Sequence, residues 1–255
     1  MCAEDLLLIS ASVHGLQQML TCCAKLSIEL NLEFNCKKSS CVKIGKKSHC
    51  VITPMSLGAG KIEWTDSFKY LGVTFKAGER LVTDLTFVKR KFFVASNSVL
   101  GNAKCFDDIV KLRLVESHCF PILCYSTAAM TVTKTQIQEL NVCWNSIYRR
   151  IFGFNKWESV THFIAGLGRL NFRHTRILLC LKFIKSGLSS RNSVYKNAVL
   201  RYCLSEKFKD VCSDAGFDIS DCPHNNANIR QTIMSGNLSR IICEKFFNTC
   251  MHAES

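Results

Sequence analysis

The chain lacks the features that mark several broad classes of protein. Only 3 of its 255 residues are proline and 47% are hydrophobic, so the composition excludes a disordered chain and predicts a packed core. No apolar run approaches the roughly 18–20 residues that cross a bilayer. The short apolar stretch Leu6–Val13 follows acidic residues, whereas a secretory leader begins with basic ones. We therefore expect a globular protein of one or two domains that is not secreted.

Zinc-site and disulfide spacings are also missing, although the chain has 16 cysteines. No C-x-x-C pair occurs anywhere in the sequence. The nearest approach to a zinc cluster is a C-terminal set with irregular gaps, Cys212, Cys222, His224, Cys243, Cys250 and His252. Scattered free thiols are the simpler interpretation, and they indicate a reducing compartment, the cytoplasm or the nucleus.

Negative charge is the scarcer sign in this sequence. The 33 Lys and Arg residues exceed the 20 Asp and Glu residues, which gives a net charge of +13. Between Asn145 and Arg201 there are eleven Lys or Arg residues and a single acid, Glu158. Such an excess predicts a polyanionic partner, nucleic acid before anionic membrane. A basic face that contacts only solvent is the competing explanation.

Aromatic residues are interleaved with these cations. They suit stacking on nucleic-acid bases, although most of them are expected to face the core instead. The five residues are Tyr148, Phe152, Phe154, Trp157 and Phe172.

Up to about residue 80 the apolar pattern predicts mixed α and β structure. A helix is expected over Val13–Leu30, with Ser12 as its N-cap. We expect a buried strand at Leu6–Ile9 and short strands at Glu33–Asn35 and Cys41–Ile44. A hairpin is expected from Lys61–Trp64 and Phe68–Lys76, with its turn at Thr65–Ser67.

Beyond residue 80 the pattern becomes helical. Five apolar residues at helical spacing form one stripe, Leu85, Val88, Phe92, Ala95 and Val99. A second helix is expected over Asp107–Cys119, ending near Pro121. The capping box Thr133-x-x-Gln136 opens a helix that ends at Gly153. Its expected inward residues are Ile137, Leu140, Trp144, Ile147 and Ile151. Further helices are expected at about residues 158–165, 173–188, 193–213 and 228–249.

The first residues contain an acidic pair, Glu4 and Asp5, directly before the apolar run. Carboxylates at a tight turn can bind divalent cations, and a nucleotidyl-transferring polymerase needs two metals roughly 4 Å apart. An acidic pair before an ordinary strand is the commoner explanation when the pair is taken alone.

Four motifs in order resemble those of the reverse transcriptase of non-LTR (LINE-type) retrotransposons. They are Cys2–Ser10, Gly15–Gln17, Phe34–Ser39 and Phe68–Val73. A later stretch, from Leu140 to Phe154, is similar to the region that follows the polymerase core in that family. The likeness spans residues 1 to about 190. It implies an α+β chain with a truncated palm remnant at residues 1–80, a thumb-like helical region at 81–190 and a helical C-terminal region at 191–255.

The resemblance also implies roles for individual residues. Glu4 and Asp5 match the catalytic Tyr-Ala-Asp-Asp turn, in which carboxylates bind Mg²⁺. Lys38 matches a palm lysine near the incoming nucleotide, although a solvated turn explains it equally well. The primer grip, a hairpin that holds the primer 3′ end, corresponds to Phe68, Tyr70, Leu71 and Gly72. The residues implied to contact the RNA template and the RNA/DNA primer–template duplex are Lys89, Arg90, Lys91, Arg149, Arg150, Arg169, Arg173 and Arg176.

Departures from the family pattern predict a degenerate active site. Cys2 stands where the family has Tyr, and Glu4 stands where it has the metal-binding Asp. Mg²⁺ requires nearly ideal octahedral geometry, and a displacement of about 1 Å can lower a rate about 100-fold. The family's other essential Asp precedes this turn and has no counterpart in the sequence. We therefore expect that Mg²⁺ is not productively bound and that the chain is inactive by itself.

Three alternatives to a degenerate polymerase fragment stay open from the sequence. The chain can be a mis-started piece of a longer polymerase, or a basic nucleic-acid-binding module that has lost catalysis. It can also be a structural or interaction protein with no nucleic-acid partner, which the charge excess after Asn145 disfavours. No membrane partner is expected, and the oligomeric state is left open.

Overall fold

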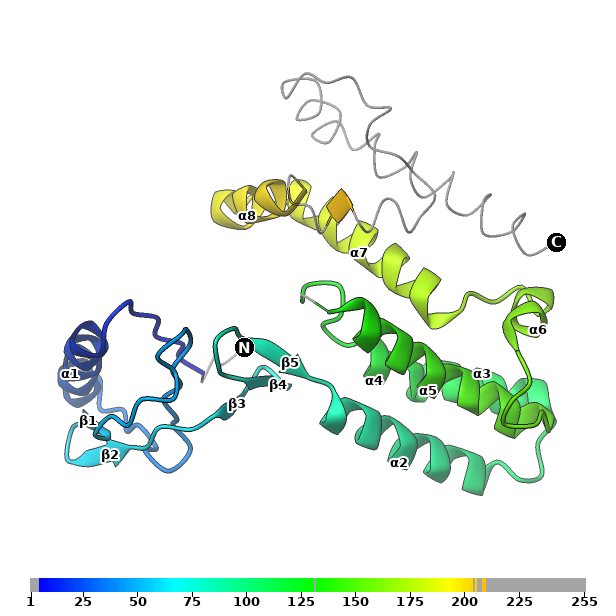
Figure 1. Cartoon of the computed structure of the whole chain (residues 1–255), viewed down its shortest axis with the longest axis horizontal. Helices are drawn as coiled ribbons and strands as arrows, with labels where there is room; N and C mark the ends of the chain where they lie inside the picture. Colours follow the sequence, from blue (N-terminus) through cyan, green and yellow to red (C-terminus); the bar gives the residue numbers. More distant parts are fainter. Residues whose placement is uncertain (1–4, 131, 204, 206–207, 210–255) are drawn as a thin grey trace, which may run out of the picture. The chain divides into compact units, whose positions relative to one another are not determined.

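The computed structural model describes residues 5–130, 132–203, 205 and 208–209. Over these residues the fold is α+β, with helices and two small antiparallel sheets (Figure 1). The chain divides into two compact units, the first ending at Phe87 and the second beginning at Val88. We describe each unit by itself.

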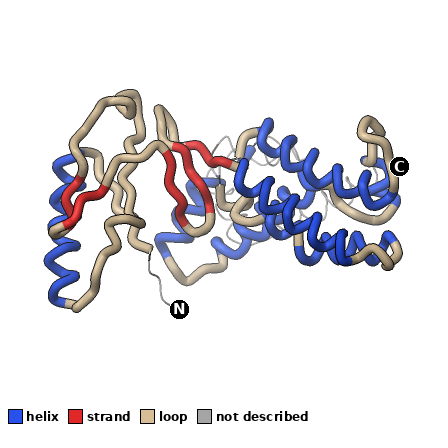
Figure 2. Tube along the Cα trace, turned by 90° about the horizontal axis from the view of Figure 1, so that it is seen from below, coloured by secondary structure: helices blue, strands red, loops and turns tan. Residues whose placement is uncertain are grey.

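Unit 1 combines one helix with the two sheets (Figure 2). The helix is α1, Val13–Glu29. The strands are β1 (Met55–Leu57), β2 (Gly60–Ile62), β3 (Ser67–Tyr70), β4 (Val73–Lys76) and β5 (Val82–Asp84). Strands β1 and β2 form a two-stranded sheet, and β3, β4 and β5 form a three-stranded sheet in that order.

Helix α1 forms where the sequence predicts it. The Ser12 hydroxyl accepts a hydrogen bond from the Gly15 amide at 3.0 Å, which satisfies one of the first N–H groups of the helix. Leu20 is the buried residue of this helix, and it packs in one cluster with buried residues of β1 and β2. The C-terminal end of the helix is more open, since Leu26 is 52% exposed and the C-cap Leu30 is 65% exposed.

The prediction of a buried strand at Leu6–Ile9 is wrong. Residues 5–10 have no regular secondary structure, and Leu6 and Ile9 are 60% and 77% exposed. The expected strands at Glu33–Asn35 and Cys41–Ile44 are also absent from the described chain, where Cys41 makes an isolated bridge with Trp64. A strand is stable only beside a neighbour that takes its backbone hydrogen bonds, and an apolar run of four residues cannot specify that neighbour.

The β1–β2 and β3–β4 hairpins have two-residue loops with positive φ, which such loops require. Gly58, with φ of +59°, lies in the loop between β1 and β2. Leu71 and Gly72, with φ of 47° and 81°, form the loop between β3 and β4. The sequence instead predicted one hairpin with its turn at Thr65–Ser67, and that prediction is wrong.

Unit 2 is helical in the part that the structure describes. Helix α2 continues into it from the end of unit 1. The helices are α2 (Thr86–Asn102), α3 (Asp108–His118), α4 (Phe120–Cys124), α5 (Lys134–Phe152), α6 (Thr161–Gly166), α7 (Phe172–Leu188) and α8 (Ser193–Cys203). They confirm the helices expected between residues 85 and 188. The helix expected at 193–213 is confirmed as far as Cys203, and most of the rest of that range lies outside the described residues. The expected helix at 228–249 lies outside the described residues.

The sequence-based helix boundaries of α5 are confirmed in detail. The Thr133 hydroxyl accepts from the Gln136 amide at 3.2 Å, and the Gln136 side chain accepts from the Thr133 amide at 3.0 Å. Gly153 ends the helix in the left-handed conformation, with φ of 72°. Pro121 has a role that the sequence did not predict, because it lies in the first turn of α4 and so starts a short helix.

Helix α5 provides much of the core of unit 2, and it packs against α3 and α7 (Figure 1). All five residues that were expected to face inward are buried. Trp144 is the centre of an aromatic cluster, with ring centroids 4.2 Å from Phe120, 5.4 Å from Tyr148 and 6.3 Å from Phe92. This packing fixes the orientation of the cations that α5 carries on its other face.

Candidate nucleic-acid interface

The expected metal site falls at the edge of the described chain. Glu4 lies outside the described residues, and Asp5 is an exposed carboxylate in a segment without regular secondary structure. Among the residues that the structure describes, no group of three or more His, Cys, Asp or Glu side chains could hold a metal ion. Asp5 by itself does not supply the donor set of a Mg²⁺ site, so we assign no reaction step to magnesium. The six Cys and His residues considered for zinc, from Cys212 to His252, also lie outside the described residues.

Lys38 lies in a turn that Asn35 organises. The Lys38 amide donates to the Asn35 carbonyl and side-chain oxygens, each at 3.1 Å, and the Ser39 hydroxyl donates to the Asn35 carbonyl at 3.0 Å. An Asn side chain that bonds its own following backbone explains why this residue type suits the position. The Lys38 side chain is exposed.

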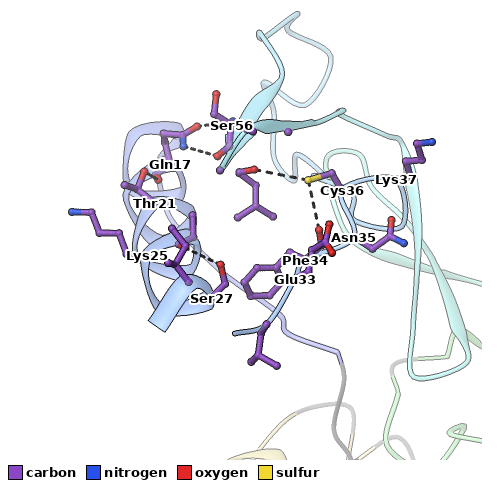
Figure 3. Close-up of a pocket in the computed structure, with 17 residues that line it drawn as sticks. Gln17, Thr21, Lys25, Ser27, Glu33, Phe34, Asn35, Cys36, Lys37 and Ser56 are labelled. Carbon is purple, nitrogen blue, oxygen red and sulfur yellow. Dashed lines mark hydrogen bonds between the residues drawn. The ribbon is translucent and has the colours of Figure 1, made fainter. Parts of the chain in front are cut away.

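A groove of about 1020 Å³ opens between α1, the segment 32–37 and the turn of the β1–β2 hairpin (Figure 3). The Gln17 amide spans one wall, donating to the Ser56 carbonyl at 2.8 Å and accepting from the Ser56 amide at 3.0 Å. The structure brings Lys37 to this groove, but Asp5, Lys38 and the primer-grip residues do not line it. Sequence reasoning missed this groove, and no pattern in the residues that form it indicated it.

The implied primer-grip residues lie on the β3–β4 hairpin. Phe68 stacks on Phe75 across the strand pair at 5.3 Å, and Phe68 and Tyr70 share one half-buried face of β3. Leu71 lies at the tip of the hairpin and is 60% exposed. A bulky non-glycine residue at positive φ is unusual, and the tight turn imposes this conformation on Leu71.

Asp84 connects this sheet to the start of α2. Its carboxylate accepts a hydrogen bond from the Thr86 amide at 2.9 Å and forms an ion pair with Lys76 at 3.0 Å. These interactions with Thr86, and secondly with Lys76, lower the pKa of Asp84 to about 2.

Helices α2 and α5 lie side by side and run in the same direction. Three pairs of residues in the same order along both helices show this: Lys89 with Glu139, Phe92 with Trp144, and Asn97 with Arg150. Lys89 is therefore engaged in an ion pair, at 2.6 Å. Arg90 and Lys91 follow it on the exposed side of α2 and make no ion pair with any described residue.

The arginines of α6–α7 have different environments. Arg169 Nε lies 2.9 Å from Glu116 Oε1, at the half-buried edge of α3, although the N–H is not aligned for a hydrogen bond. Arg173 is exposed on the first turn of α7. Arg176 is 7% exposed and lies inside the helical core, so the surface that nucleic acid can reach does not include it.

Three titratable groups of unit 2, Tyr148, Cys124 and Cys203, are removed from water by burial. Burial, together with the nearby Glu116, raises the pKa of Tyr148 far above its ordinary value. Burial also raises the pKa of the Cys124 thiol to about 12 and that of Cys203 to about 11. Such thiols are poor nucleophiles at neutral pH, which fits the interpretation of scattered free cysteines.

Of the five aromatic residues interleaved with the cations, four pack inside the helical unit and one is exposed. Tyr148 and Phe172 are fully buried, and Phe152 and Phe154 pack against Phe163 at 4.7 and 4.9 Å. Trp157 is the exception, because it is 87% exposed. The neighbouring Arg149 donates from Nε to the Glu158 carbonyl at 2.9 Å and so attaches the loop of Trp157 to the end of α5.

Comparison with protein-family models, with curated proteins and with solved structures finds no match for this chain. No helix in the described part of the chain is long and apolar enough to span a membrane. We therefore infer function from the residues, their geometry and the order of the motifs.

Proposed function

We propose that the chain is a fragment of an RNA-directed DNA polymerase of the non-LTR retrotransposon type, inactive by itself, that still binds RNA and RNA/DNA primer–template duplexes. The ancestry rests on the order of the motifs between Cys2 and Phe154. The binding rests on the charge and exposure of the helical unit.

The hairpin geometry supports the assignment of a primer grip. A two-residue loop presents Leu71 at an exposed tip, and the rest of the hairpin is held by the Phe68–Phe75 stack and by β5. A rigid hairpin with an exposed tip suits a part that holds a primer end in position. Strand β5 then leads along the chain into α2, which carries Lys89, Arg90 and Lys91.

The excess of cations over acids in the helical unit is the observation that carries the proposed binding. Acids near the cations are paired locally: Glu139 with Lys89, Glu116 with Arg169, and Glu158 with Asn155. The exposed cations of α2 are not neutralised by these contacts. Free cations on a helical surface contact phosphates without regard to sequence, which is what a duplex-tracking thumb requires.

The lack of polymerase activity is proposed from the sequence. Glu4 stands where the family uses Asp, and a carboxylate displaced by one methylene is a poor ligand for Mg²⁺. The second candidate is accordingly a basic nucleic-acid-binding module without preference for a primer–template junction. The capped and well-packed helices of unit 2 favour it, because they do not depend on the catalytic turn.

Two double variants with the same change in net charge test the proposed surface. Arg90→Ala with Lys91→Ala removes two exposed cations of α2. Lys46→Ala with Lys47→Ala removes two exposed lysines of unit 1 and is the matched control. For binding to a primer–template duplex, we expect the first double variant to reduce the steepness of the slope of log K, the association constant, against log salt by about 2. Each phosphate contact that is lost means that about one counterion fewer is released on binding.

The control pair should leave that slope unchanged. Equal slopes for the two double variants would contradict the placement of the surface on α2. Absence of binding by the unmodified chain at low salt would contradict the proposed function itself.

A further inference from the structure

Trp157 occupies a small, well-defined turn between α5 and α6. The Glu158 amide donates to the Asn155 carbonyl at 3.2 Å, so Lys156 and Trp157 are the two central residues of a β-turn. The Glu158 carboxylate closes the turn from the other side, accepting from the Asn155 amide at 2.6 Å and from its side-chain amide at 3.1 Å. The backbone that presents Trp157 is therefore fixed.

Both flanks of the turn are anchored to the helices. Arg149 of α5 bonds the Glu158 carbonyl, and the Phe154 amide donates to the Arg149 carbonyl at 3.0 Å. Phe154 packs on Phe163 of α6. A large indole on an anchored turn is presented to solvent with little loss of conformational entropy on binding, which favours a role as a recognition residue.

The charge around the indole selects the kind of partner. The Lys156 ammonium lies over the Trp157 ring, 4.9 Å from its centroid, and the tryptophan as a whole is 87% exposed. Glu158 is the only acid between Asn145 and Arg201, and both of its carboxylate oxygens are engaged within the turn. An exposed aromatic ring beside a cation is the pattern that binds a nucleic-acid base and its phosphate.

We propose that Trp157 is a stacking platform for an unpaired base of single-stranded RNA or DNA, with Lys156 attracting the phosphate of the same strand. This inference rests on the proposed nucleic-acid binding and makes it more specific. Bases inside a duplex are already stacked on their neighbours and are not available to an indole. Trp157 therefore binds the single-stranded part of a template.

Tryptophan fluorescence of the full chain tests the inference directly. The three tryptophans are Trp64, Trp144 and Trp157, of which Trp144 is buried and Trp64 donates its indole N–H to the Thr53 carbonyl at 2.9 Å. The probe is a short oligouridylate, with a blunt duplex of the same length as comparison. We expect the single strand to quench the fluorescence and the duplex not to do so, and the Trp157→Phe variant to lose most of the quenching.

Affinity of the variants for the single strand provides the second measurement. Trp157→Ala should weaken binding about 5- to 150-fold, the range measured for loss of one base–aromatic stack, and Trp157→Phe should restore most of it. The salt slope should stay unchanged, because stacking releases no counterions. Val194→Ala, which truncates another exposed apolar residue of unit 2, is the control and should have no effect.

The outcomes separate this inference from the proposed function. Binding of the oligouridylate with no change in quenching or affinity in the Trp157 variants would overturn the stacking role and leave the proposed function standing. A Trp157 response to vesicles of anionic phospholipid, but not to the oligouridylate, would assign the residue to a membrane surface and overturn the inference. If the chain bound no nucleic acid at all, both the stacking role of Trp157 and the proposed function would be contradicted.

Discussion

Gln17 links helix α1 to strand β1 through two hydrogen bonds with the backbone of Ser56. The side-chain amide makes the pair of backbone hydrogen bonds that a neighbouring strand would otherwise make. The two residues form part of one wall of the groove (Figure 3). Ser56 lies on a short strand whose other edge pairs with β2. The side chain therefore supports the β1 edge of a two-stranded sheet, which is marginally stable by itself.

We predict that Gln17→Ala loosens the β1–β2 hairpin. Loss of both bonds should cost about 1–2 kcal/mol, because the Ser56 amide and carbonyl then bond only to water. Amide hydrogen exchange measures this directly, and we expect the protection of residues 55–62 to fall about 5- to 30-fold. Gln18→Ala is the matched control, since Gln18 bonds to the exposed His14 on its own helix and not to β1 or β2. Equal effects of the two substitutions would contradict the role of Gln17.

Single residues with local roles were predictable from the sequence. Ser12, Thr133 and Gln136 act within one helical turn of their own position, so their spacing in the chain contains the relevant geometry. Trp157 was not singled out among five aromatics, because its exposure depends on how distant helices bury the other four. The pairing of Asn155 with Glu158 could have indicated a turn at this position.

Helix α5 packs against both α3 and α7, and its N-terminus carries a complete capping box. We predict that Thr133→Ala lowers the stability of unit 2 by about 1 kcal/mol, because the Gln136 amide loses its acceptor. Thermal unfolding followed by circular dichroism at 222 nm measures the change. Thr135→Ala, two residues further in the exposed first turn, should be neutral or slightly stabilising because alanine has the higher helix propensity. A larger loss from Thr135→Ala than from Thr133→Ala would contradict the capping role.

The connection between β5 and α2 should depend on pH through Asp84. Its pKa is about 2 in the folded chain, below its ordinary value of 3.8, so the carboxylate stabilises the fold fully above about pH 4. This contribution is lost as the pH falls from about 4 towards 2. Denaturant unfolding at several pH values should show the loss in the unmodified chain and not in Asp84→Asn. Asp66→Asn, which removes an exposed carboxylate just before β3, should retain the loss; if it behaves like Asp84→Asn, the assignment is wrong.

The strands were harder to predict than the helices for a physical reason. A helix satisfies its backbone within one segment, so the periodicity around Phe92 or Trp144 predicts it locally. The partner of β2 is β1, and this choice depends on the turn at Gly58 rather than on any pattern within β2. The loop formed by Leu71 and Gly72 similarly requires a leucine at positive φ, which turn preferences do not predict.

At the scale of the whole molecule, the two units have different importance for the proposed function. Unit 1 contains the segment that follows the proposed catalytic turn, and Asp5 is exposed there without regular structure around it. Unit 2 contains capped helices, a packed aromatic cluster, the exposed cations Arg90 and Lys91, and the exposed Trp157. We therefore expect nucleic-acid binding without polymerisation.

Binding of the full chain to an RNA/DNA primer–template over a range of salt concentrations, with primer extension assayed in the same reactions, tests this claim most directly. Deoxynucleotides are supplied with Mg²⁺ and then with Mn²⁺. We predict binding that weakens steeply with salt, as phosphate contacts require, and no extension with either metal. Templated extension of the primer, or the absence of binding even at low salt, would contradict the account.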